Sequence, residues 1–143
     1  MDFSYSVLKE GCSAISKYNP DLVLHVGDIV ESSKNDNDIK EDFNKVAELL
    51  SSINSNSKPV SWYSAAGDHD VNPPDDYIPG TTDYSKKNLF LQLLQREFLN
   101  RNPSTDINKL YYSFDYKNYH FICLFSEDNL RSDPRWGNIL WIK

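Results

Sequence analysis

The sequence predicts a layered α/β fold in which helices cover a mixed sheet. Segments with helical spacing alternate with short apolar runs, and two of these runs end at a Gly-Asp pair. Near the C-terminal end, two aromatic segments flank four polar residues. Alternating helices and strands are typical of sheets covered by helices. With 143 residues, 39% of them hydrophobic and 13% aromatic, the chain is long enough for one domain with a core.

The first predicted elements are a helix and a strand. Residues 4–18 carry apolar side chains at helical spacing, and Asn19-Pro20 ends the pattern. Residues 21–26 are a short apolar run before Gly27. Such a run predicts a strand that is buried on both faces of a sheet.

A second helix and a second strand follow. Apolar residues recur every three or four positions from residue 39 to 53, which is the strongest helical pattern in the chain. We assign this apolar face, Val46 included, to the core. Residues 51–58 read as a polar connection, and residues 60–66 predict a second buried strand that Gly67 ends.

The last third predicts a loop, a helix and a hairpin. Residues 72–85 contain three prolines and form a long irregular loop, which could provide a wall of a substrate site. Residues 89–98 have helical spacing. The runs 110–114 and 119–125 flank a polar turn and predict an antiparallel hairpin. A final helix is expected to begin at residue 136.

Charge and composition exclude several classes of protein. The net charge is −6, and residues 1–71 hold 12 acidic and 6 basic residues. This acidic half opposes binding to nucleic acid, which needs clustered Lys and Arg, but suits a site for divalent cations. Two distant cysteines support neither a disulfide framework nor a cysteine zinc site. Without a signal-like start or a membrane-length apolar run, the default expectation is a soluble, cytoplasmic protein.

The two Gly-Asp pairs are the main candidates for chemistry. Ligands of open α/β sheets bind beyond the carboxyl ends of strands, and parallel neighbouring strands would bring Asp28 and Asp68 together there. Two close carboxylates repel each other unless a cation lies between them. His69 could add a metal ligand or a proton donor. The structural alternative is that each Gly-Asp pair only forms a turn or caps a helix.

Three blocks of the sequence resemble calcineurin-like metallophosphoesterases. The segment Pro20 to Glu31 resembles the Gly-Asp block of that family. The segment Pro59 to Asp70 is similar to its second block, usually Gly-Asn-His followed by an acid, and residues 112–121 resemble the hairpin that follows. The resemblance covers about residues 5–143. It implies a layered α-β-β-α sandwich with a mixed sheet, incomplete at both ends, in which residues 1–143 form a single partial domain.

The resemblance also implies roles for individual residues. Asp28 would bridge two metal ions, and Asp68 would ligate one of them in place of the usual Asn. His69 would protonate the leaving oxygen or stabilise the phosphoryl group, with Glu31 assisting it. Asp70 would be a supporting acid. The ions would be Mn, Fe, Zn, Ni or Co, and a hydroxide bound to both would attack a small phosphomonoester or phosphodiester.

The chain departs from the family pattern in two ways. Asp68 adds a negative charge that lowers the electrophilicity of the site. The family's Asp-x-His, lone His and Gly-His-x-His ligands are not found, so the chain alone is expected to be nearly inactive. His25 and His120 are expected to be packed, hydrogen-bonded structural residues that do not replace these ligands. The alternative function is an inactive remnant of the fold that acts as a binding module. A nucleotide-binding domain is disfavoured because the sequence has no Gly-rich phosphate loop.

Overall fold

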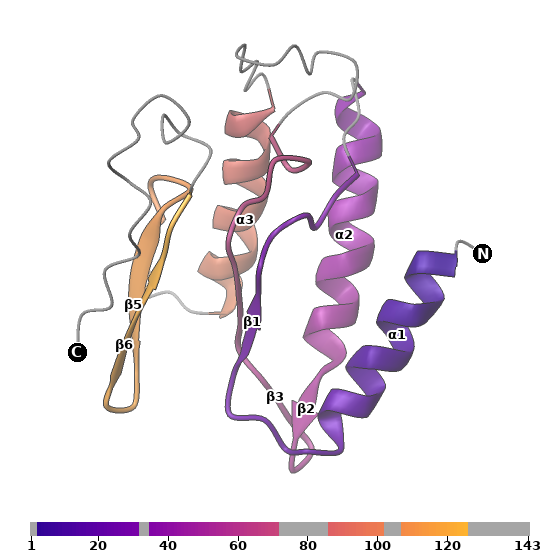
Figure 1. Cartoon of the computed structure of the whole chain (residues 1–143), viewed down its shortest axis with the longest axis vertical. Coiled ribbons are helices and arrows are strands. Elements are labelled where there is room, and N and C mark those ends of the chain that lie inside the picture. Colours follow the sequence, from indigo (N-terminus) through magenta and orange to yellow (C-terminus); the bar gives the residue numbers. More distant parts are fainter. Residues whose placement is uncertain (1–2, 32–34, 72–85, 102–106, 126–143) are drawn as a thin grey trace, which may run out of the picture.

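The computed structural model describes residues 3–31, 35–71, 86–101 and 107–125 (Figure 1). The helices are α1 (Phe3–Ser16), α2 (Asp36–Ser52) and α3 (Lys87–Arg101). The strands are β1 (Val23–His25), β2 (Asn54–Ser55), β3 (Lys58–Pro59), β4 (Trp62–Ser64), β5 (Tyr112–Tyr116) and β6 (Tyr119–Cys123). Apart from the short β2–β3 hairpin between α2 and β4, the described elements follow the predicted order of helix, strand, helix, strand, helix and hairpin. The predicted loop 72–85 and the helix expected from residue 136 lie outside the described residues.

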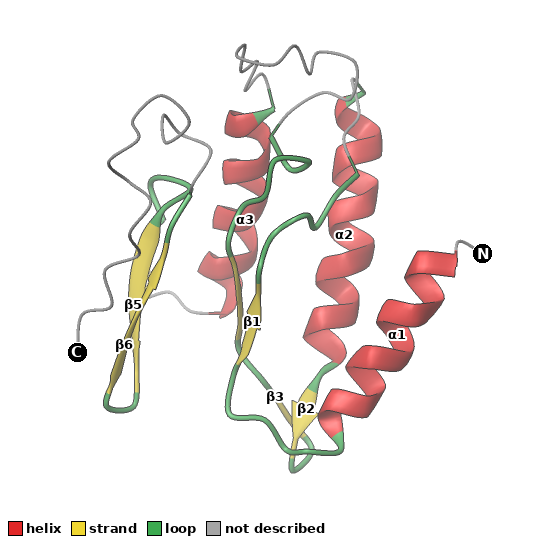
Figure 2. Cartoon of the chain, viewed as in Figure 1, coloured by secondary structure: helices red, strands yellow, loops and turns green. Residues whose placement is uncertain are grey.

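The described strands form small sheets of two strands each (Figure 2). Strands β1 and β4 are parallel neighbours, with Val23 opposite Trp62 and His25 opposite Ser64. Strands β5 and β6 form the predicted antiparallel hairpin. The chain is therefore a mixed α/β protein. Its two apolar runs form parallel strands, as expected if Asp28 and Asp68 lie at the same edge of the sheet.

The prediction of strands buried on both faces is right for β4 and wrong for β1. All three residues of β4 are buried. In contrast, Leu24 of β1 is 50% exposed, and Val26 just beyond it is 90% exposed. The reason lies in what packs on each strand. Aromatic rings of α3 and the hairpin cover β4, whereas Leu24 and Val26 lie outside the core that the described residues form.

Capping and periodicity explain the position of α2. The Asn35 side chain accepts a hydrogen bond from the backbone N–H of Asn37 (2.9 Å), which caps the first turn. Asp36 and Asp38 lie in that turn, where negative charge is favourable. Helix α2 packs against both α1 and α3. None of the described helices has the length and apolar character needed to cross a membrane.

Aromatic contacts connect α2, α3, β4 and the β5–β6 hairpin. Phe43 of α2 meets Phe90 of α3 edge to face, with ring centroids 5.7 Å apart. Tyr63 of β4 stacks on Phe114 of β5, with centroids 3.5 Å apart. The Tyr112 hydroxyl donates a hydrogen bond to the Ser64 carbonyl oxygen (2.8 Å). Strand β4 is thus held from several sides, which fixes the loop that follows it.

Two local features were not predicted correctly. The polar connection 51–58 contains the β2–β3 hairpin, whose turn residues Asn56 and Ser57 both have positive φ. Its strands are too short to show alternation of apolar residues. The turn of the β5–β6 hairpin is also tighter than expected, because Tyr116 pairs with Tyr119.

Replacement of Phe43 should destabilise the protein strongly. Phe43 is fully buried between α2 and α3, so Phe43→Ala should lower the free energy of unfolding by about 3–5 kcal/mol. Urea denaturation followed by circular dichroism measures this loss. Val7→Ala, at a half-exposed position of α1, is the control and should change it by at most about 0.5 kcal/mol. Similar losses in both variants would contradict the assignment of the core.

Candidate metal centre

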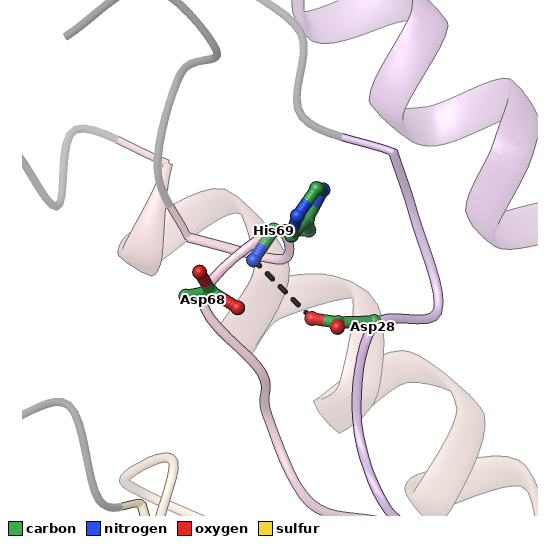
Figure 3. Close-up of side chains that lie close together, drawn as sticks. All are labelled: Asp28, Asp68 and His69. Atoms are coloured by element: carbon green, nitrogen blue, oxygen red, sulfur yellow. Dashed lines mark hydrogen bonds between the residues drawn. The ribbon is translucent and has the colours of Figure 1, made fainter. Parts of the chain in front are cut away.

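The loops that follow β1 and β4 meet at the carboxyl ends of these parallel strands. Asp28 comes from the first loop, and Asp68 and His69 come from the second (Figure 3). Each residue offers one possible ligand atom, and these atoms all lie within 4.8 Å of one another. The sequence-based prediction that the two Gly-Asp turns share one edge of the sheet agrees with this geometry.

Both glycines allow the loops to approach, for different reasons. Gly27 has a φ of 107°, a conformation that residues with a side chain rarely adopt. A Cβ atom at Gly27 would also lie only 2.7 Å from the backbone nitrogen of Gly67. A Cβ atom at Gly67 would overlap the Asp28 carboxylate. Contact between the two loops therefore requires glycine at both positions.

Asp28 has an unusual backbone conformation. Its φ is 56°, in the left-handed region that costs most residues on the order of 1–2 kcal/mol and Asp somewhat less. Such a conformation persists where surrounding contacts hold it. One contact joins the two loops directly, because the backbone N–H of His69 donates a hydrogen bond to Oδ1 of Asp28 (3.3 Å; Figure 3).

Asp70 is a buried carboxylate behind the cluster. It has no exposed surface. Its Oδ2 accepts hydrogen bonds from the backbone N–H groups of Asp28 (2.9 Å) and Gly67 (2.8 Å). Its Oδ1 accepts one from the N–H of Val30 (3.0 Å). Burial raises the pKa of Asp70 to about 6, the three N–H donors oppose this rise, and the nearby charge of Asp28 adds to it. This environment agrees with the supporting role expected for Asp70.

Asp28 and His69 border a cavity of about 780 Å³ between α1, α2 and the loop after β1. Its other lining residues are Tyr5, Leu8, Ile29, Val30, Glu31, Asp42, Lys45 and Val46. Glu31 is exposed and is not one of the clustered ligand atoms, so its catalytic role stays a prediction. The walls from α1 and α2 were not predicted. Helical periodicity placed Val46 in the core; Val46 is partly buried and packs against the core, and it also lines the cavity, which periodicity does not show.

The other two histidines lie outside the cluster. Nδ1 of His25 is 3.2 Å from the Ser64 hydroxyl and accepts a hydrogen bond from the Gly27 N–H (3.3 Å). Burial lowers the pKa of His25, and the charge of Asp28 partly opposes this. The expected structural role fits His25. For His120 the expectation of packing is wrong, because its side chain is 56% exposed, but the expected hydrogen bond is present: Nδ1 lies 2.7 Å from Oδ1 of Asp115 on the paired strand.

The composition of the cluster suits a divalent cation. Two carboxylates and an imidazole are ligands that zinc and other transition metals accept. A cation between Asp28 and Asp68 would also relieve their mutual repulsion. Asp28 and Asp68 fill only part of one coordination shell, even if His69 is added to them, since each ion needs about four to six ligands. The described residues thus fit part of a metal centre.

Comparison with known proteins agrees with this geometry. A family model described as calcineurin-like phosphoesterase matches residues 4–142, which include both Gly-Asp turns and the hairpin. Comparisons with curated proteins and with solved structures give no significant match. Because the family match covers nearly the whole chain, the chain belongs to the calcineurin-like phosphoesterase family.

Proposed function

We propose that this chain supplies part of a dinuclear metal centre that hydrolyses a small phosphomonoester or phosphodiester. The observation that carries the proposal is the cluster of Asp28, Asp68 and His69 at the edge of the parallel strands. Family membership supports metal-dependent hydrolysis as the general chemistry. The adjoining cavity, which Asp28 and His69 line, provides space for a small substrate beside the cluster.

The proposed roles follow from the chemistry of each side chain. Asp28 would hold two ions, and Asp68 would hold one of them; Mn, Fe, Zn, Ni and Co are the candidates. When bound, such ions lower the pKa of water and neutralise charge on phosphate oxygens. His69 would protonate the leaving oxygen, and Glu31, which lines the same cavity, would assist it. The remaining ligands would come from outside the described residues.

We also propose that the chain belongs to a single domain with the α-β-β-α layering of a sandwich. The contacts between β4 and the β5–β6 hairpin support this arrangement. In the complete domain, further strands would cover Leu24 and Val26, which are exposed here.

A second candidate function is a binding module without turnover. The specific observation in its favour is Asp68, since a second carboxylate beside Asp28 makes the cluster more negative than the Asn usual in the family would. Metal could still bind while a less electrophilic site slows hydrolysis. The two functions differ in whether metal binding is accompanied by turnover.

Replacement of the proposed bridging ligand should abolish activity. The test uses a longer protein that contains this chain and supplies the remaining metal ligands. In that protein, Asp28→Asn should reduce the Mn²⁺-dependent hydrolysis of p-nitrophenyl phosphate or bis-p-nitrophenyl phosphate. The loss should exceed the roughly 10–100-fold typical of residues that only support a ligand. Asp115→Asn, at an exposed hairpin carboxylate, should leave the rate unchanged. Unchanged activity of Asp28→Asn would exclude the bridging role.

His69 should affect turnover more than metal binding. A positioned acid contributes about 10²–10⁴ in rate, so His69→Ala should lower kcat by a factor in that range. Metal content, measured by elemental analysis, should stay close to that of the unmodified protein. His120→Ala controls for the loss of an exposed imidazole. Loss of the folded structure in His69→Ala would instead identify a structural histidine.

Asp68→Asn, made in the same protein that supplies the remaining metal ligands, distinguishes the enzyme from the binding module. The amide keeps a ligating oxygen and removes one negative charge, so an enzyme should show the same kcat or a higher one. A binding module should show no hydrolysis in either form, although both forms bind Mn²⁺. Loss of an existing activity in Asp68→Asn would show that the carboxylate itself is needed.

A further inference from the structure

Asp70 contacts both loops of the metal centre without belonging to the cluster of ligand atoms. Its carboxylate accepts the N–H groups of Asp28 and Val30 from the loop after β1. It also accepts the N–H of Gly67 from the loop after β4. The side chain has no exposed surface, so water does not compete for these bonds. A single buried group therefore joins the two loops.

The joined loops determine where the ligand atoms lie. The N–H that Asp70 accepts from Asp28 belongs to the residue with a φ of 56°, so this bond holds the backbone that directs the Asp28 carboxylate. The bond to Gly67 holds the residue directly before Asp68. The N–H of His69 in turn contacts the Asp28 carboxylate. Asp28 is thus hydrogen-bonded directly to Asp70, Asp68 follows a residue that is hydrogen-bonded to Asp70, and His69 is hydrogen-bonded to Asp28.

We infer that Asp70 is a positioning residue of the metal centre: it sets the separation of the Asp28 and Asp68 carboxylates and thereby the affinity and geometry of metal binding. This inference rests on the proposed function, because it concerns the same site. It goes beyond a merely supporting role, since it predicts that a residue without contact to metal controls how metal is coordinated.

Hydrogen-bond chemistry shows why a carboxylate is needed. An ionised carboxylate offers two acceptor oxygens and no donor, which suits three converging N–H groups. The amide of Asn has one acceptor oxygen and an NH₂ group that is only a donor. If that oxygen takes the place of Oδ2, Val30 loses its acceptor. If it takes the place of Oδ1, Asp28 and Gly67 lose theirs. Asp70→Asn therefore removes at least one of the three hydrogen bonds that Asp70 accepts, while the volume of the side chain changes little.

The test is a Co²⁺ titration of the chain followed by visible absorption, because the position and intensity of the cobalt bands report coordination geometry. Circular dichroism verifies that each variant is folded. Asp70→Asn should bind Co²⁺ about 10–100-fold more weakly, as is typical when a residue that orients a ligand is removed. Its bands at saturation should differ from those of the unmodified chain. Asp115→Asn makes the same chemical change at an exposed site and should alter neither affinity nor bands.

Three outcomes separate the possibilities. A folded Asp70→Asn variant with unchanged affinity and unchanged bands would overturn the inference and leave the metal centre in place. If Asp28→Asn binds Co²⁺ as well as the unmodified chain does, the proposed metal centre itself is wrong. If Asp70→Asn does not fold, Asp70→Glu replaces it in the titration. Glu keeps both carboxylate oxygens but moves them by one methylene, and the stabilising osmolyte trimethylamine N-oxide is added to favour the folded state of this variant and of the unmodified chain. Folding with weaker binding supports the inference, and folding with full binding overturns it.

Discussion

The close contact between the loops after β1 and β4 is the constraint on which the site depends. The backbone of Gly67 lies against the Asp28 carboxylate so closely that no side chain fits between them. The same contact places Asp28, the residue with a left-handed backbone, beside the N–H of His69. Hydrogen bonds to the buried Asp70 hold the two loops in this position. The absence of side chains at Gly27 and Gly67 lets the loops approach each other, and hydrogen bonding keeps them there.

The two loops follow strands that differ in burial: the β4 loop follows a fully buried strand, and the β1 loop follows a partly exposed one. Strand β4 is fully buried, with aromatic rings on it and the Tyr112 hydroxyl bonded to its last carbonyl. The end of this loop also contacts the start of α3: the Lys86 N–H donates a hydrogen bond to the Val71 carbonyl oxygen (3.2 Å), and the Lys86 ammonium pairs with Asp36 at the start of α2 (2.6 Å). Strand β1 is partly exposed, and its loop is held both by hydrogen bonds to the β4 loop and by Ile29 and Val30, which are buried in the core.

The sequence predicted the parts of this arrangement that depend on local pattern. Helical periodicity identified α1, α2 and α3, and the repeated Gly-Asp pair identified the edge where Asp28 and Asp68 meet. Features that depend on tertiary contacts could not be predicted. Nothing local shows that Leu24 is half exposed, that Val46 lines a cavity besides packing against the core, or that Asp70 accepts hydrogen bonds from N–H groups about 40 positions away. The β2–β3 hairpin was missed because a two-residue strand has no periodicity.

The lack of space beside Gly67 separates two kinds of position around the cluster: those in the two loops and those in the cavity walls. In the loops, a change of residue disturbs the contact itself, so few substitutions can be accepted there. The cavity walls that α1 and α2 provide, at Tyr5, Leu8, Lys45 and Val46, lie outside this loop contact, although Tyr5, Leu8 and Val46 also pack against the core. Efforts to redesign substrate preference by directed evolution should therefore concentrate their libraries on these helix positions and leave the loops untouched.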